Sequence, residues 1–241
     1  MAKKKGNTNQ NVPQEKMFLL GVDLRDRNNL AILLGILLVS FFSYMPVFQN
    51  GFVNWDESIY IQDNLLIRSL NLKDIFSTFQ IGNYHPLTML VYAIEYKLFG
   101  LNETGYHTVN LLLHILNVFL VYQLIILLSD KLIVAQVAAL LFGIHPIHVE
   151  SVAWAAELKD LLYTAFFLGS YIYYLKFLKN NKNKYYLLSL LLFLLSLLSK
   201  AMAASLPILL ILTDYFLGRK ANSKTFLEKA PYFILDRKSV V

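Results

Sequence analysis

Two adjacent carboxylates are the first residues of this sequence that suggest chemistry. Asp56 and Glu57 close the run FVNWDE, which follows a long apolar segment. Such a pair can direct one carboxylate into a site, as a general base, while neighbouring groups hold the other. The alternative is structural, because Asp is a favoured N-cap residue and would cap a helix that begins here.

Four polar side chains further along form a stripe. His107, Asn110, His114 and Asn117 are spaced by three, four and three residues. At about 100° per residue they fall within an arc of about 80° on one helix face. A stripe of this kind on an apolar helix must face protein or a water-filled cavity. It predicts either substrate binding by His107, Asn110 and His114 or hydrogen bonds that hold neighbouring helices together.

A third group of ionisable residues lies between positions 145 and 160, in HPIHVE and ELKD. His148 and Glu150 are candidates for substrate binding, and with His145 they carry donor atoms that suit a metal. Their spacing matches no metal-site pattern, so we expect no metal centre and no cofactor. Lys159, joined by Lys200, suits a ligand that carries phosphate. The alternative for a lone lysine near a helix end is that it snorkels to the membrane surface.

Composition indicates the class of protein in which these groups sit. The chain has 241 residues, of which 56% are hydrophobic and 16% charged, with a mean hydropathy of +0.49. An average soluble domain is about 25% charged. The absence of Cys excludes disulfide scaffolds, zinc ribbons and iron–sulfur centres. We therefore expect an all-α fold, a polytopic transmembrane helix bundle.

Apolar runs predict about six membrane spans, within a range of five to seven. The runs cover Leu30–Val47, Val109–Leu128, Leu132–Ile144, Leu161–Leu178, Tyr185–Leu198 and Ala201–Leu217. The last two would form one helix of about 50 Å, too long for one crossing, so a break is expected at Lys200. The long loop after the first span is expected to be extracytoplasmic and to hold interfacial helices. One is predicted over Pro86–Phe99, because Pro opens the segment and Gly follows it.

The distribution of Lys and Arg predicts the orientation. Residues 1–27 are expected to form a disordered basic tail in the cytoplasm. Fourteen Lys and Arg residues then lie inside and five outside, as the positive-inside rule requires. Topology therefore accounts for the net charge of +6, and nucleic acid is not an expected partner. All five histidines, including His85, fall on the outer side, which is the predicted working face.

Several motifs occur in an order that resembles a known superfamily. They are FVNWDE, YHPLT at 84–88, GYH with Asn110 and His114, HPIHVESVAW at 145–154, ELKD at 157–160, and SK…LP…DY between 199 and 215. Over about residues 28–220 this set resembles the GT-C superfamily of polyprenyl-phosphate-sugar glycosyltransferases. It is most similar to the branch that carries tetratricopeptide repeats, which includes the transmembrane O-mannosyltransferases and many bacterial membrane proteins.

The resemblance implies an enzyme that moves a sugar from a polyprenyl-phosphate donor to a hydroxyl group of a protein or envelope glycan. Asp56 would act as general base, with inversion at the anomeric carbon. Lys159 and Lys200 would stabilise the phosphate leaving group, with His148 or Arg68 in support.

The remaining candidates would position the substrates or form hydrogen bonds to them. They are Glu57, beside the general base, and His85, His107 and Glu150. Two positions depart from the family pattern. The first acidic pair is often Asp-Asp in the family, and Leu158 stands where the bacterial signature has Arg, which leaves more of the phosphate charge to Lys159.

A non-catalytic membrane protein is the competing interpretation. It would be a transporter, a scaffold, or a degenerate protein that binds a lipid-linked sugar without transferring it. A transport pathway needs polar groups through the whole bilayer, whereas here they stop near the midplane and collect outside, which favours an outward-facing enzyme site. We expect a multi-pass protein of the bacterial inner membrane.

The end of the sequence predicts a truncated gene. Residues 221–235 begin a further segment, and Asp236–Val241 read like the translation of a common sequencing adapter. On this hypothesis residues 28–220 are an incomplete GT-C-like membrane domain, and activity of the fragment itself is not predicted.

Overall fold

The computed structural model describes residues 18–19, 22–23 and 27–239. Most of the expected tail, residues 1–27, therefore lies outside the described residues. Within that tail the strands β1 (Phe18–Leu19) and β2 (Val22–Asp23) pair antiparallel. The rest of the described chain consists of helices and their connections, which confirms the all-α class.

Helices of very different lengths make up the fold. The long ones are α1 (Arg27–Ser43), α4 (Pro86–Phe99), α5 (Glu103–Ser129), α6 (Leu132–Ile144), α8 (Leu158–Asn180), α9 (Asn183–Ser199), α10 (Leu206–Phe216) and α12 (Ala230–Ser239). The short helices are α2 (Leu65–Ser69), α3 (Leu72–Ser77), α7 (Val149–Ala153) and α11 (Ser223–Leu227). Short 3-10 or π-helical turns are η1 (Met45–Gln49), η2 (Ser58–Gln62), η3 (Pro146–His148), η4 (Ala155–Glu157) and η5 (Ala201–Ser205).

The expected count of six spans is not confirmed. Among the described residues, three helical stretches are long and apolar enough to cross a membrane: Arg27–Gln49, Glu103–Ser129 and Ala155–Asn180. A fourth crossing requires α6 and Pro146–Ala153 together, although the pair is bent by 48°. The stretches after Asn183 fall short because the chain breaks at Lys200, as predicted, and leaves helices of 17 and 11 residues.

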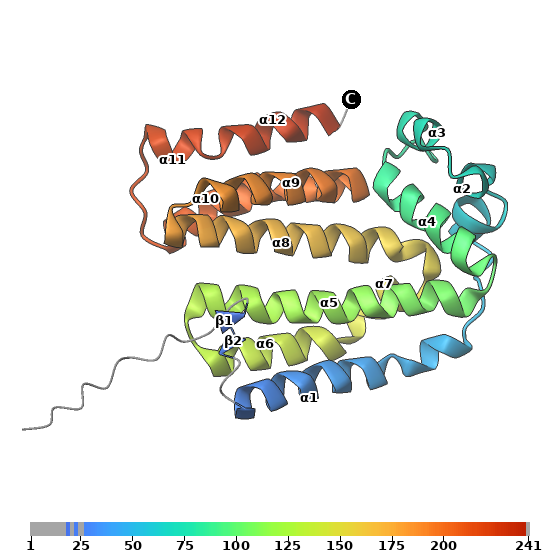
Figure 1. The fold of residues 1–241 in the computed structure, drawn as a ribbon, viewed down its shortest axis with the longest axis horizontal. Helices are drawn as coiled ribbons and strands as arrows, with labels where there is room; N and C mark the ends of the chain where they lie inside the picture. The colour runs from blue at the N-terminus through green and yellow to red at the C-terminus, as the bar shows by residue number, and fades with distance from the viewer. Residues whose placement is uncertain (1–17, 20–21, 24–26, 240–241) are drawn as a thin grey trace, which may run out of the picture.

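The helices run back and forth along the long axis of the molecule (Figure 1). Helices α2, α3 and α4 gather at one end, together with the α6–α8 and α9–α10 connections (Figure 1). The α5–α6 and α8–α9 connections lie at the opposite end (Figure 1). The groups expected on the outer side of the membrane thus collect at a single end of the bundle.

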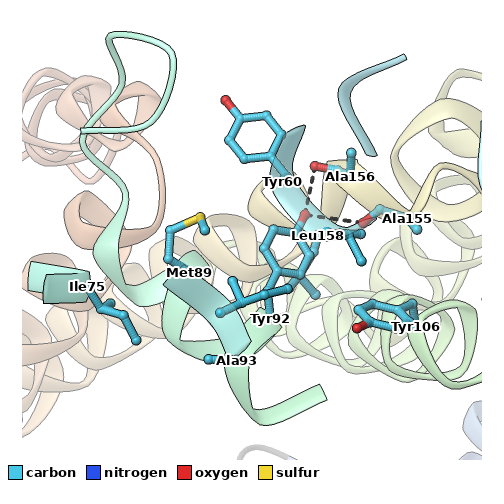
Figure 2. Close-up of a cluster of buried hydrophobic side chains, with 11 residues drawn as sticks. Tyr60, Ile75, Met89, Tyr92, Ala93, Tyr106, Ala155, Ala156 and Leu158 are labelled. Atoms are coloured by element: carbon cyan, nitrogen blue, oxygen red, sulfur yellow. Dashed lines mark hydrogen bonds between the residues drawn. The ribbon is translucent and has the colours of Figure 1, made fainter. Parts of the chain in front are cut away.

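Helix α5 is central, because it packs against α1, α6 and α8. Helix α1 approaches α6 closely at Gly143. A Cβ atom at Gly143 would clash with Ser40 Oγ, so glycine permits this approach. Helix α4, whose bounds equal the predicted ones, closes the site end over a buried cluster that includes Tyr60, Met89 and Tyr92 (Figure 2).

Helix α4 carries a buried carboxyl. Glu95 is 2% exposed, and among the residues that the structure describes neither of its carboxylate oxygens has a hydrogen-bond partner. Burial raises the pKa of the Glu95 carboxyl well above its ordinary value. The folded protein therefore binds more protons than the unfolded chain above the ordinary pKa of Glu, and stability falls as pH rises through that region.

Replacing Glu95 by Gln should remove this loss of stability. We expect Glu95→Gln to raise the unfolding midpoint at pH 8 by a few degrees and to flatten its dependence on pH above about 4.5. Thermal unfolding in detergent from pH 4 to pH 9 measures both effects. The exposed Asp63→Asn is the control, and a variant less stable than wild type at pH 8 would contradict the assignment.

Candidate functional site

The acidic pair after the first span divides its two carboxylates between different tasks. Glu57 is fully buried, and its carboxylate accepts hydrogen bonds from the backbone N–H groups of Val53 and, at 3.1 Å, Ala155. Burial raises the pKa of Glu57, although these bonds oppose the shift. Asp56 is partly exposed instead, and its Oδ2 lies 4.0 Å from Lys159 Nζ.

Three side chains hold the break that precedes α8. Asn110 Nδ2 donates to the carbonyl of Trp154 at 3.1 Å, and the Glu57 carboxylate receives the N–H of Ala155. Tyr92 Oη donates to the carbonyls of Ala155, at 3.2 Å, and Ala156, at 2.9 Å (Figure 2). Because these side chains come from three separate segments, they fix the start of α8, which carries the charged residues described next.

Five charged residues form what we call the lysine–carboxylate cluster: Asp56, Glu157, Lys159, Asp160 and Lys200. Lys159 Nζ lies 2.9 Å from Glu157 Oε1. Lys200 pairs with Asp160 and lies 3.9 Å from Glu157 Oε2. Both lysines are mostly buried, with 15% and 28% of their side chains exposed, and the cluster joins the loop before η2, the start of α8 and the end of α9.

The position of Lys200 follows from the break after α9. The helix ends at Ser199, whose carbonyl accepts a bond of 2.9 Å from Thr88 Oγ1 on α4. Ser196 Oγ donates to the carbonyl of Tyr163 at 2.8 Å and fastens α9 to α8. The extended backbone at Lys200 then turns its side chain towards Asp160.

Both lysines line a cavity of about 600 Å³. Its walls are formed by Asn83, Tyr84, His85, Lys159, Lys200, Ala201, Met202, Ala204 and Ser205. Two cations therefore stand beside a mostly apolar wall from η5, which consists of two alanines, Met202 and Ser205. This combination suits an amphiphile with an anionic head and an apolar tail.

His85 lies in the wall of this cavity as a neutral base. Burial, aided by the positive charges of Lys159 and Lys200, lowers the pKa of His85 to about 4. Its ring centroid lies 5.4 Å from that of Tyr60, and its buried Nε2 has no hydrogen-bond partner in the described part of the chain. At neutral pH this imidazole can form a hydrogen bond with a ligand but adds no charge.

The polar stripe on α5 does not reach the cavity. His114 Nε2 lies 3.0 Å from the carbonyl of Gly143, and Asn117 donates to the carbonyl of Leu161 at 2.9 Å. His107 is fully buried against the backbone of Asn50 and Gly51. Asn110, His114 and Asn117 thus bond to the backbone of other segments, and no residue of the stripe lines this cavity.

Two further candidates also stand apart from the cavity. His148 packs against Phe142, with 4.4 Å between ring centroids, and Glu150 on α7 is exposed. Conversely, the site predicted from the sequence does not include Glu157 or Asp160. Glu157 lies close to both lysines, and Asp160 pairs with Lys200. The signal was present in the ELKD run, where acids flank the lysine by two residues and by one. In the described part of the chain, no group of three or more His, Asp or Glu residues is placed to hold a metal.

Comparison with known proteins agrees with these motifs. The family model of the dolichyl-phosphate-mannose-protein mannosyltransferases matches residues 84–235, more than half of the chain. The chain belongs to this family. The match begins after Asp56, so the acidic pair lies outside the matched region.

Curated relatives carry the same kind of name. The protein O-mannosyl-transferase TMTC3 of Mus musculus is 32% identical over 136 residues, which cover 52% of this chain and 15% of the relative. A protein O-mannosyl-transferase of Caenorhabditis elegans is 28% identical over 178 residues, 68% of this chain and 24% of the relative. The chain thus spans less than a quarter of the length of these relatives. No solved structure matches it.

Mutation of Tyr92 tests whether its hydrogen bonds stabilise the break before α8. Tyr92→Phe leaves two buried carbonyls without this donor and should lower the free energy of unfolding by about 1–3 kcal/mol. Equilibrium unfolding in detergent measures the loss. Tyr215→Phe, at a position 86% exposed, is the matched control. Equal stability of the two variants would show that Tyr92 does not anchor the break.

Proposed function

We propose that this family member transfers a sugar from a polyprenyl-phosphate donor to a hydroxyl group of a polypeptide, with inversion at the anomeric carbon. The observation that carries the proposal is the convergence of Asp56, Lys159 and Lys200 from three separate segments beside a cavity of about 600 Å³. The names of the relatives, all protein O-mannosyl-transferases, support a protein acceptor and a mannosyl group.

In the proposed reaction Asp56 accepts the proton of the acceptor hydroxyl. The hydroxyl oxygen forms a bond to the anomeric carbon while the bond from that carbon to the phosphate oxygen breaks. The electron pair of the breaking bond stays on the phosphate, which leaves as polyprenyl phosphate. Lys159 and Lys200 stabilise the charge that develops there, and His85 forms a hydrogen bond to the donor.

The other candidates act through structure in this proposal. Glu57 positions Asp56 by holding the loop against η4, and Asn110 holds the same break from α5. His114 helps to keep α5 in register with α6, because its ring bonds to the carbonyl of Gly143, and His107 packs where α5 meets the first loop. No step requires a metal ion, so chelation of divalent metals should leave transfer unchanged.

The proposed orientation places the N-terminus in the cytoplasm and the lysine–carboxylate cluster outside. Residues 28–220 then form the membrane domain, and the stretch 221–235 begins a further segment. The bundle would traverse the bilayer about six times, with the shorter α9 and α10 making the last two crossings. A bacterial inner membrane is the location proposed from the motifs, while the curated relatives come from animals.

The general base provides the sharpest test. Asp56→Asn keeps the shape of the side chain but cannot take a proton, so transfer should fall at least a hundredfold while donor binding persists. The assay supplies a radiolabelled polyprenyl-phosphate mannose and a threonine peptide to the chain in membranes. Asp63→Asn is the exposed, charge-matched control. Transfer by Asp56→Asn at the wild-type rate would overturn this assignment.

The two lysines provide a second test, which needs only donor binding. Lys159→Met and Lys200→Met should each weaken binding of the polyprenyl-phosphate sugar about tenfold or more, because each removes a charge that faces the cavity. Lys73→Met, at an exposed position of α3, is the control. Equal affinity in all three variants would show that the donor does not bind in this cavity. Tight binding without transfer by the wild-type chain would leave a binder of lipid-linked sugar instead of an enzyme.

A further inference from the structure

An exposed indole stands directly beside the proposed general base. Trp55 precedes Asp56 in the chain, and 70% of its surface is accessible. Its ring stacks on Trp154, with 5.4 Å between centroids and 28° between planes. A side chain as apolar as tryptophan rarely remains this exposed next to a charged cluster unless something covers it.

The backbone around Trp55 is held in place. The Trp55 N–H donates to the carbonyl of Val53 at 2.8 Å, and the Trp55 carbonyl accepts from Ser58 Oγ at 2.8 Å. Trp154, the base of the stack, is itself fixed because its carbonyl accepts the bond from Asn110. The indole is therefore pre-organised, and a partner that packs on it loses little conformational entropy.

Two further exposed apolar residues lie close to Trp55 in the chain. Val53 and Ile59 are each 49% exposed and flank Trp55 in the chain. We call Val53, Trp55 and Ile59 the indole patch. None of the three lines the cavity that holds Lys159 and Lys200, so the indole patch and the proposed donor site are separate surfaces that meet at Asp56.

We propose that the indole patch binds the acceptor polypeptide, by packing against an apolar side chain next to the residue that presents the hydroxyl. The inference rests on the proposed function, because a general base must lie within hydrogen-bond reach of the acceptor hydroxyl. The lysines that the donor phosphate needs line the cavity, and no residue of the indole patch does, which leaves the indole patch for the acceptor. An aromatic anchor of this kind selects for apolar residues near the modified one.

The composition of the chain provides a probe of this site. The sequence contains two tryptophans, Trp55 and Trp154, and both belong to the stack. In Trp154→Phe the intrinsic tryptophan emission comes from Trp55 alone. The probe peptide is a Trp-free dodecamer with one Thr flanked by Leu, added to the full chain in lipid nanodiscs without donor.

We expect a saturable blue shift of the Trp55 emission on addition of the peptide, and none on addition of a polyprenyl monophosphate. The shift should persist in Asp56→Asn combined with Trp154→Phe. A shift with the polyprenyl phosphate alone, or no shift at millimolar peptide, would overturn the proposal. Quenching of Trp55 by brominated lipid before peptide is added would overturn it too, because the indole would then be a membrane anchor.

Kinetics separate this inference from the proposed function. Trp55→Ala should raise KM for the peptide about tenfold, with kcat and KM for the donor within twofold of wild type. Trp55→Phe should restore most of the peptide affinity, because a smaller aromatic ring still packs. A fall in kcat with unchanged peptide KM would contradict acceptor binding while leaving the transfer reaction intact. Loss of transfer with an unchanged fluorescence titration would contradict the proposed function alone.

Discussion

The interrupted helix before Leu158 is the constraint on which the site end of this molecule depends. A chain that leaves helical geometry near a bilayer exposes backbone carbonyl and N–H groups, and each unpaired group costs several kcal/mol in hydrocarbon. Here the groups of Trp154, Ala155 and Ala156 find partners in side chains from other segments. The break is stable only when the first loop, α4 and α5 are all in place, so assembly of the bundle and formation of the site are the same event.

This coupling explains why so many polar residues near the site touch no cavity. Glu57 and Tyr92 form hydrogen bonds with backbone groups. The polar stripe on α5 likewise bonds to the carbonyls of Gly143 and Leu161. Their effect on chemistry is indirect, since they set where Asp56 and Lys159 stand. A loss of activity on mutation of such a residue would therefore indicate a displaced site residue and not a lost contact with substrate.

Local signals in the sequence predicted local features well. Pro86 and the glycine after Phe99 mark the bounds of α4, and the length limit of one crossing marks the break at Lys200. The spacing of the α5 stripe predicts a buried polar face, but periodicity does not say which neighbour meets it. That choice depends on carbonyls released by breaks elsewhere, at Gly143 and Trp154, which no local pattern encodes. The acids that pair with Lys159 and Lys200 could not be predicted for a related reason. The spacing of the lysines does not indicate which carboxylates the fold brings next to them.

The span count of six is not confirmed, for a physical reason. Apolar composition alone does not distinguish a complete crossing from a shorter helix packed inside a bundle. Helix α10 has only 11 residues, and α6 reaches a membrane length only through a bend of 48°. Breaks of this kind bring polar backbone and charged side chains to one end of the bundle. The helix breaks that make the spans hard to count therefore also position the residues of the candidate site.

The described chain contains two networks of charged side chains, and their comparison distinguishes a candidate site from a structural ion-pair network. At the far end Asp214 and Glu228 pair with Arg219 and with Lys229, and Lys229 is 2% exposed. Two acids and two cations close on themselves there and fasten α10 to the segment that follows. The lysine–carboxylate cluster differs, because three acids share two lysines. Its lysines also line a larger cavity, of about 600 Å³, whereas the cavity beside Asp214, Arg219 and Lys229 measures about 220 Å³.

The proposed transfer moves negative charge without changing its total within the site. A polyprenyl-phosphate sugar brings one negative charge, and Asp56 holds another. When Asp56 takes the proton, the leaving phosphate gains the charge that Asp56 loses, so the total within the site stays constant. Lys159, which lies 4.0 Å from Asp56 and lines the cavity, is placed to follow the charge from one to the other. The electrostatic cost of the reaction is then a short displacement of negative charge past a fixed cation, which a pre-organised site accommodates with little reorganisation.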